Sequence, residues 1–383
     1  MRIIQSQLLL EKGTDLLGKV RISGGGRCNV THACFDPVKL ISSYPRGSQA
    51  LRGPFSRFQP QDTIDWFSTH GVELKTEADG RMFPVSNTSH TIVDCLMQAA
   101  TQAGVTIRKP ISISTITPVE NGFRLLLNDG ELLYADRLLL ATGSNREGYR
   151  WVESLGHMLI PPVPSLFTFQ IADQRLSGLS GLSVSRAHVE LVGTGLQQTG
   201  PILITHWGFS GPAILKLSAW GARVLHEKVY RAELVIDWIP ETSWDEMKTI
   251  FLKAKTNVAK RTVASQSLFS TLPQRLWARW IESANIPRTR TWSDMTREEI
   301  LKLQESLKRS VFLIHGKGEF KEEFVTAGGV ALEDVDFRTM ESRRCPGLYF
   351  AGEILDIDGV TGGFNFQSAW TTGFIAGQSI GKS

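Results

Sequence analysis

The spacing of apolar residues in the first hundred positions predicts a strand and two helices. Gln7–Leu10 is a short apolar run that ends in Glu11, which is typical of a buried strand followed by a loop. Apolar side chains recur at helical spacing over residues 61–70 and 88–103. Gly104 is expected to end the second helix, because glycine adopts the left-handed conformation that follows many helices.

Residues 105–143 have the pattern of a β-meander followed by a buried strand. Asn121-Gly122 and Asp129-Gly130 are typical hairpin turns. Arg137 is followed by three leucines, and this stretch predicts a fully buried strand that runs into Ala141-Thr142-Gly143. The segment therefore predicts an α/β nucleotide-binding domain with an antiparallel insertion. The meander strands are expected at 105–107, 111–119, 123–127 and 132–134.

Later segments predict a second domain that interrupts the first. Three prolines at positions 161, 162 and 164 break the pattern and mark a boundary. Two capping boxes, Ser243 with Glu246 and Thr296 with Glu299, support helices in the middle of this domain. A final helix is expected over about 367–380. The predicted parts are 1–163, an inserted β-rich domain over 164–325 with a helical subdomain at about 242–310, and 326–383.

Composition and charge narrow the classes of function. The 383 residues carry a net charge of +4, and the basic residues are scattered along the sequence. We therefore expect a small-molecule substrate and no nucleic-acid partner. No apolar run is long enough for a membrane span, and the N-terminus has no secretory signature. Four cysteines in a chain of this length do not suggest a disulfide framework, so a cytoplasmic protein is expected.

Two features near the N-terminus fit a dinucleotide. Glu11 ends a predicted strand, where a carboxylate accepts hydrogen bonds from the adenosine ribose; the alternative is a solvated loop side chain. Ser23–Asn29 contains Gly24, Gly25 and Gly26, whose backbone suits an anion or a flavin edge, although a flexible turn has the same composition. Arg27 in this segment is expected to neutralise pyrophosphate charge.

Three further features fit a flavin. Ala141-Thr142-Gly143 follows one buried strand, and Ala351-Gly352-Glu353 follows another, where Glu353 is placed to hold ribityl hydroxyls. Asp358–Gln367 is a glycine-rich loop that opens the last helix, and the amide groups and dipole of a helix N-terminus suit the flavin pyrimidine oxygens and a phosphate. The five features occur in the order expected of one FAD-binding domain.

At this point the sequence resembles a known family, the BaiN-type NAD(P)/FAD-dependent oxidoreductases, which are also called HI-type or aminoacetone-oxidase-like. The resemblance implies an FAD domain of Rossmann-like, three-layer α/β fold built from both ends of the chain. It also implies the inserted β-rich domain with its helical part. The resembling motifs are Leu10-Glu11-Lys12, Ile22–Asn29, Leu139–Gly143, Thr205–Pro212, Thr326–Val330 and Gly352–Gly363.

The expected cofactor is FAD, with NAD(P)H as reductant on the strength of the resemblance alone. Asp356 and Asp358 are expected either to contact the flavin or to cap the last helix. The expected cofactor-binding residues are Glu11, Lys12, Gly24, Gly25, Gly26, Arg27, Cys28, Asn29, Ile113, Thr142, Gly143, Gly352, Glu353, Asp356, Asp358, Gly362, Gly363, Asn365 and Gln367.

The chain departs from the family at its start. Family members begin with a strand, a Gly-x-Gly-x-x-Gly turn and a helix before the Leu-Glu-Lys strand, whereas only six residues precede Gln7 here and the turn occurs nowhere in the sequence. The expectation is an incomplete reading frame or a degenerate paralogue that binds FAD poorly. Neighbouring strands of the sheet would then have unpaired backbone groups.

No catalytic triad is expected, because a flavin carries the redox chemistry itself. His206 is the best titratable residue of the inserted domain and is expected to be either a proton donor or structural. Cys28 and Cys34 lack the spacing of a redox motif, and Cys28, His32 and Cys34 lack a fourth ligand for zinc.

Three functions therefore remain open. The first is an FAD-dependent oxidoreductase that reduces an enone-like bond or oxidises a small amine. The second is a truncated or degenerate flavoprotein without catalytic activity. The third is a tRNA-modifying flavoprotein, which predicts a basic face.

Overall fold

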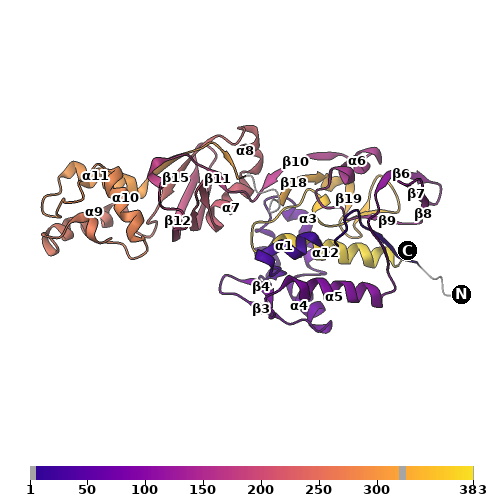
Figure 1. Cartoon of the computed structure of the whole chain (residues 1–383). Helices are drawn as coiled ribbons and strands as arrows, with labels where there is room; N and C mark the ends of the chain where they lie inside the picture. The colour runs from indigo at the N-terminus through magenta and orange to yellow at the C-terminus, as the bar shows by residue number, and fades with distance from the viewer. Residues whose placement is uncertain (1–5, 319–324, 383) are drawn as a thin grey trace. The chain divides into compact units, whose positions relative to one another are not determined.

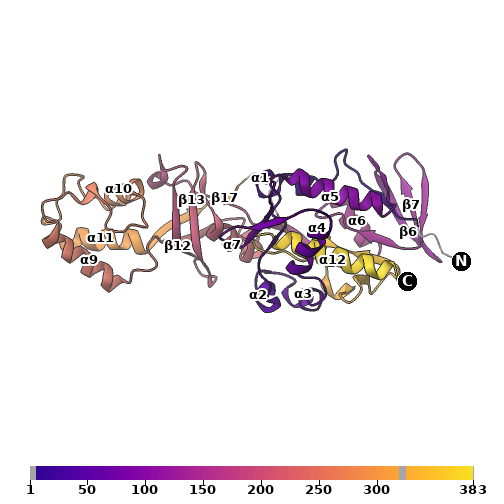
Figure 2. The same cartoon turned by 90° about the horizontal axis from the view of Figure 1, so that it is seen from below.

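The computed structural model describes residues 6–318 and 325–382. The chain divides into two compact units, Met1–Val163 with Val325–Ser383 and Pro164–Phe324. The first unit is therefore built from both ends of the chain, and the second is inserted between them. Figure 1 and Figure 2 show each unit from two sides.

Two pairs of parallel strands organise the first unit. Strand β1 (Leu8–Leu10) pairs with β5 (Thr106–Arg108), and β9 (Leu138–Leu140) pairs with β21 (Leu348–Phe350). The prediction of a fully buried strand at 137–140 is wrong, since Leu139 is 37% exposed. In the described part of the chain β9 is an edge strand of its sheet, so its outer side has no covering strand.

Smaller antiparallel sheets complete this unit. Three of the predicted meander strands are confirmed as β6, β7 and β8, whereas the first, at 105–107, overlaps β5, which pairs with β1 outside the meander. The prolines at 161, 162 and 164 lie in strand β10, which pairs with β18, and the two units divide within this strand, between Val163 and Pro164. Proline is tolerated there because β10 lies at the edge of a two-stranded sheet. The bounds are β2 Thr31–His32, β3 Leu74–Thr76, β4 Arg81–Pro84, β6 Ile113–Val119, β7 Gly122–Leu127, β8 Leu132–Ala135, β10 Leu159–Ser165, β18 Val325–Val330, β19 Val335–Asp336 and β20 Glu341–Ser342.

The helices of the first unit include the three that the apolar spacing predicted. Helix α12 (Phe364–Ile380) begins three residues earlier than expected, because Gly363 has a left-handed φ of 95° and turns the loop directly into the helix. The other helices are α1 Gly18–Gly26, α2 Pro37–Ile41, α3 Ser48–Phe55, α4 Pro60–Thr69, α5 Ser89–Gln102, α6 Arg146–Ser154, and the 3-10 turns η3 Leu332–Asp334 and η4 Gly352–Ile354.

The inserted unit contains a seven-stranded antiparallel sheet in the order β16-β15-β12-β13-β14-β11-β17. Helices α7 (Pro212–Trp220) and α8 (Ala222–Glu227) were not expected from the sequence. Proline at the first position of α7 was the signal that could have revealed it. The strands are β11 Phe169–Gln170, β12 Ser183–Leu191, β13 Leu196–Ile204, β14 Gly208–Ser210, β15 Ala232–Asp237, β16 Ser310–Ile314 and β17 Gly316–Lys317, with η1 at Gln174–Leu176.

A helical layer follows β15 and returns to β16 (Figure 1). It consists of α9 (Trp244–Asn257), η2 (Val263–Ser265), α10 (Gln274–Ser283) and α11 (Arg297–Lys308). Both predicted capping boxes are confirmed, at the start of α9 and of α11. The layer packs on a core that includes four fully buried indoles, and this core fixes the helices to the sheet. They belong to Trp238, Trp277, Trp280 and Trp292.

Candidate cofactor site

The glycine loop before α12 lies directly against the segment after the first glycine cluster. With its amide oriented to satisfy both partners, Asn29 accepts a hydrogen bond from the Gly363 N–H at 2.9 Å. Gln367 is fully buried, and its carbonyl oxygen accepts hydrogen bonds from Thr31 at 2.5 Å and Thr63 at 3.0 Å. The His32 ring stacks on Phe364 with 4.7 Å between the centroids. Two predicted parts of the site, more than 300 residues apart, therefore form one structure.

An ion pair fixes the other end of the same loop. The Arg46 guanidinium donates to both carboxylate oxygens of Asp358, which is fully buried, and the two residues also form an antiparallel β-bridge. Asn365 donates to the Gly359 carbonyl at 2.9 Å and accepts from the Gly359 N–H at 2.8 Å. Asp358 and Asn365 thus fix the shape of the loop, and several of its backbone groups, the Gly359 and Gly363 N–H among them, have partners within the chain.

Glu353 joins three segments at the carboxyl end of β9. Its carboxylate accepts from the Lys19 ammonium group and from the Thr326 N–H, the latter at 3.1 Å. Gly352 donates its N–H to Thr372 at 2.9 Å. A Cβ added at Gly143 would lie 3.6 Å from Glu353. The predicted residues at the ends of β9 and β21 are therefore brought together.

Two buried hydroxyl groups at this place have no hydrogen-bond partner in the described part of the chain. They are Thr142 Oγ1 and Tyr149 Oη. Burial first, and then the charges of Glu353 and Asp356, raise the pKa of Tyr149 well above its ordinary value, so the phenol stays neutral and can donate. The sequence did not reveal Tyr149, because its position on α6 is also that of an ordinary core residue.

The first glycine cluster offers accessible backbone. Helix α1 extends into the segment that was expected to be a loop, but Gly24, Gly25 and Gly26 have left-handed backbones and the helix is kinked there. A Cβ at Gly25 or Gly26 would meet no atom within 4 Å. Next to them, the Arg27 guanidinium forms an ion pair with the Glu77 carboxylate at 2.6 Å. The same guanidinium lies over the Phe83 ring, 4.0 Å from its centroid.

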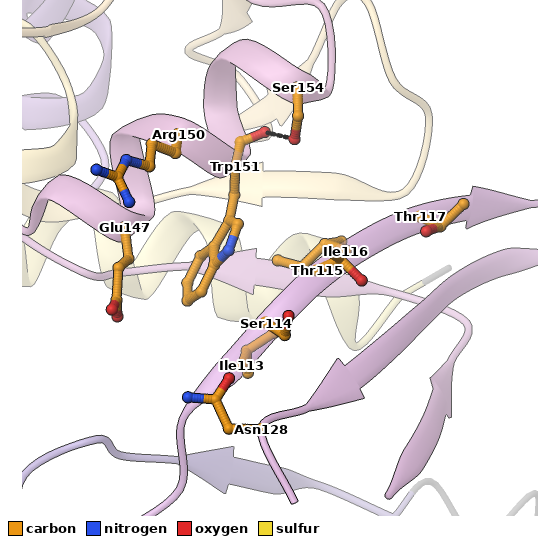
Figure 3. A pocket seen from close by; sticks show the side chains of 10 residues that line it. All are labelled: Ile113, Ser114, Thr115, Ile116, Thr117, Asn128, Glu147, Arg150, Trp151 and Ser154. Atoms are coloured by element: carbon orange, nitrogen blue, oxygen red, sulfur yellow. Dashed lines mark hydrogen bonds between the residues drawn. The ribbon is translucent and has the colours of Figure 1, made fainter. Parts of the chain in front are cut away.

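A separate depression of about 440 Å³ lies between β6 and α6. Figure 3 shows the Trp151 indole reaching from α6 toward Ile113 and Ser114. Glu147, at the rim, forms an ion pair with Lys12 at 2.7 Å. The predicted residue Ile113 therefore lines this depression, and Lys12 is linked to it through Glu147. The lining combines apolar walls with hydroxyl, amide and carboxylate groups.

Cys28 is a buried thiol rather than an exposed nucleophile. It has no exposed surface, and burial raises its pKa to about 11, although a hydrogen bond with Ser23 acts in the opposite direction. At pH 8 only about one molecule in a thousand would carry the thiolate. Cys34 is half-buried, and all four cysteines are free.

We expect iodoacetamide at pH 8 to modify Cys34 in the native protein while Cys28 stays unmodified until the protein is unfolded. The cause is the combination of burial and raised pKa at Cys28. Peptide mapping by mass spectrometry at successive times measures both rates. Modification of Cys28 as fast as Cys34 in the folded protein would contradict the structure.

His206 lies in the inserted unit, in the loop between β13 and β14. Its side chain is exposed, and the ring meets Trp207 edge-on at 4.1 Å between centroids. The structure does not test its role, which stays a prediction.

A family description, the HI0933-like protein Rossmann domain, matches residues 4–379. The chain belongs to this family. Membership confirms the predicted resemblance and the α/β Rossmann-like fold class, and at the level of the family it indicates a flavin-dependent oxidoreductase. It does not decide the substrate or the reductant.

Curated relatives of this HI0933-like protein span nearly its whole length. It is 27% identical to a 3-dehydro-bile acid delta(4,6)-reductase of Clostridium scindens, over 98% of this chain and 92% of the relative. It is 29% identical to a ribosomal RNA dihydrouridine synthase of Escherichia coli, over 97% of this chain and 91% of the relative. A solved 3-ketosteroid-delta4-(5alpha)-dehydrogenase from Rhodococcus jostii covers 98% of this chain and 92% of its own at 13% identity, with a TM-score of 0.48.

The residues of this family member fit a flavin at two places. The unpartnered hydroxyls of Thr142 and Tyr149 are buried donors that a bound polar group would satisfy, and the open backbone at Gly25 and Gly26 permits close approach. Within residues 6–318 and 325–382 no helix is long and apolar enough to cross a membrane, and no group of three His, Cys, Asp or Glu side chains is placed to hold a metal ion.

Proposed function

We propose that this protein is an FAD-dependent reductase of a carbon–carbon double bond conjugated to a carbonyl group. The carrying observation is that the segments after β9 and β21 meet beside the buried hydroxyls of Thr142 and Tyr149, which have no partner in the described part of the chain, in a member of this family. The relatives support the reaction class. The bile acid enzyme is named for reducing Δ4,6 bonds beside a 3-oxo group, and dihydrouridine differs from uridine by a reduced double bond next to a carbonyl.

The segments described above are proposed to hold FAD in a defined order. The depression lined by Ile113 takes the adenosine end. Lys12 is linked to it by its ion pair with Glu147, and Glu11 directly precedes Lys12 in the chain. The open backbone of Gly25 and Gly26 and the N-terminus of α12 take the flavin end, where their amide groups complement its oxygens.

The reaction divides between the cofactor and the chain. When bound and reduced by NAD(P)H, a flavin would supply the hydride for the β-carbon of the conjugated bond. The chain must then hold the carbonyl oxygen and deliver one proton to the α-carbon. The neutral phenol of Tyr149 is a suitable hydrogen-bond donor to an oxygen atom of the bound cofactor, because its raised pKa keeps the proton on it. His206 is our proposal for the proton donor.

We expect His206→Ala to lower turnover by about 100-fold while the flavin content is unchanged, since a general acid typically contributes at least this much. The measurement compares kcat with bound flavin per chain. His226→Ala is the matched control, because His226 is also exposed in the inserted unit and also contacts an aromatic side chain, Tyr230. Unchanged turnover for His206→Ala, or an equal loss in both variants, would exclude the role.

The reaction class is tested by reoxidation of the reduced protein without oxygen. The FAD-loaded chain is reduced with NADPH and mixed with a steroid 4-en-3-one, with uridine in RNA, and with the corresponding saturated ketone. We expect the visible flavin absorbance to return with one of the two conjugated compounds and not with the saturated one. Return with none of them, in a protein that oxygen reoxidises, would contradict the proposal.

A further inference from the structure

The helical layer of the inserted unit carries the positive charge of the chain. Residues 243–309 contain thirteen Lys or Arg and seven Asp or Glu, a net charge of +6 against +4 for the whole protein. The rest of the chain is therefore slightly negative. The near-balanced total, from which the sequence predicted no nucleic-acid partner, hides this unequal distribution.

Within this layer the charge gathers at the end that lies away from the sheet. Helix α9 leaves β15 and α11 returns to β16, where Lys308 pairs with Asp237 at 2.5 Å. The opposite end is built from residues 253–261 and 287–297, which we call the basic end. The first segment has four basic and no acidic residues, and the second has three basic residues and one acidic.

Backbone hydrogen bonds hold the two segments side by side. The Trp292 N–H donates to the Arg261 carbonyl at 3.1 Å, and the Val263 N–H donates to the Arg290 carbonyl at 2.8 Å. Thr262 and Thr291 also form an antiparallel bridge. Clusters that lie about thirty residues apart in the sequence thus form one surface, which the scattered pattern of basic residues did not reveal.

Within residues 6–318 and 325–382, four of the cations at the basic end have no hydrogen-bond or ion-pair partner for their side chains. Lys255, Arg288 and Arg290 bond to Met295, Glu282 and Glu299 respectively. Lys253, Lys260, Arg261 and Arg297 are exposed and make no side-chain hydrogen bond or ion pair in the described part of the chain. Exposed cations held close together without acidic partners create a field that attracts a polyanion.

The composition of this surface favours a nucleic acid over a membrane or a protein. The two segments of the basic end contain no exposed large hydrophobic side chain, and the exposed Leu252 and Leu301 lie just outside them. A membrane-surface helix needs an apolar face, and protein interfaces need buried apolar or aromatic anchors. Exposed side chains with neutral hydrogen-bond donors, such as Asn257 and Thr289, lie among the cations. Side chains of this kind often donate hydrogen bonds to phosphate and sugar oxygens in nucleic-acid complexes. The similar ribosomal RNA dihydrouridine synthases point to RNA rather than DNA.

We propose that the basic end of the inserted unit binds the phosphate backbone of RNA. This binding needs neither flavin nor turnover, so it holds or fails independently of the reductase activity. RNA binding at the basic end also favours a uracil base within RNA over a free enone as the substrate, because a small molecule has no phosphate backbone for this surface to bind.

The test is fluorescence anisotropy of a labelled RNA stem-loop with the full chain, repeated at several salt concentrations. We expect binding that weakens steeply with salt. Replacing Lys253, Lys260, Arg261 and Arg297 by Gln is expected to weaken binding more than about tenfold at low salt and to reduce the log–log salt slope by about 3. The four side chains are exposed, so the unfolding midpoint should change little.

A matched variant separates a local site from an effect of total charge. Lys39, Arg52, Arg124 and Lys382 are exposed cations of the other unit, and their replacement by Gln removes the same charge. This variant is expected to bind RNA within about twofold of the native chain. Equal weakening in both variants, tighter binding to phosphatidylserine vesicles than to RNA, or no RNA binding at low salt would overturn the proposal.

If the first variant fails to fold, photo-crosslinking of the native chain to RNA replaces it as the test. The crosslinks are expected to map to 253–261 or 287–297, and crosslinks elsewhere would overturn the proposal.

Discussion

Replacing Arg46 by Met is expected to lower the free energy of unfolding by about 3–5 kcal/mol, because it leaves the carboxylate of Asp358 buried without its cation. Asp358 has no exposed surface, and Arg46 is 15% exposed at its side chain. The pair joins the segment after α2 to the loop before α12, where the Tyr44 hydroxyl also donates to the Phe364 carbonyl at 2.7 Å. Denaturant unfolding followed by circular dichroism measures the loss.

Two further variants show whether the ion pair is the cause. Arg52→Met removes an exposed arginine from the neighbouring helix α3 and should change stability by less than about 0.5 kcal/mol. Arg46→Met combined with Asp358→Leu should recover part of the loss, since an apolar pair of similar size carries no buried charge. A loss below about 1 kcal/mol for Arg46→Met alone would mean that the carboxylate is solvated and that the loop is not held in this way.

Gly363→Ala is expected to destabilise the protein by about 3 kcal/mol or more and to remove bound flavin. Gly363 has a φ of 95°, which is strained for any other residue, and an added Cβ would lie 2.5 Å from the Thr31 carbonyl oxygen. The helix N-terminus would therefore move away from the segment that carries Asn29 and Thr31. Denaturant unfolding and flavin content per folded chain are the two measurements.

Gly377→Ala is the matched control for this change. Gly377 lies on the exposed side of the same helix, and a Cβ there would meet no atom within 4 Å. Because alanine is the better helix former, this variant should be as stable as the native chain or more stable by up to about 1 kcal/mol. Similar losses in both glycine variants would show that α12 is sensitive to any substitution and that the close approach at Thr31 is not the cause.

Features that depend on neighbouring residues in the chain were predictable. The capping boxes at Ser243 and Thr296 and the end of α5 at Gly104 were found where their local signals placed them. The order of the glycine-containing segments also indicated that both chain ends build one unit. Helices α7 and α8 were missed because glycine-rich turns flank their apolar residues, and such turns also flank strands.

Features that depend on contacts across the fold were not predictable from one sequence. Nothing local pairs Lys19 with Glu353 or Arg46 with Asp358, and the unpartnered hydroxyl of Tyr149 is visible only when its surroundings are known. The exposure of Leu139 depends on which strands lie beside β9, whereas its apolar sequence alone suggested full burial. The basic end likewise requires the pairing of two distant segments.

The central claim is that these segments bind a flavin, and the visible absorption spectrum of the purified chain tests it most directly. The spectrum is recorded as purified and again after titration with FAD, and the chromophore is released and identified. We expect flavin bands and FAD approaching one molecule per folded chain, lost in Gly363→Ala and retained in Gly377→Ala. A folded, colourless native protein that takes up no FAD in the titration would contradict the account.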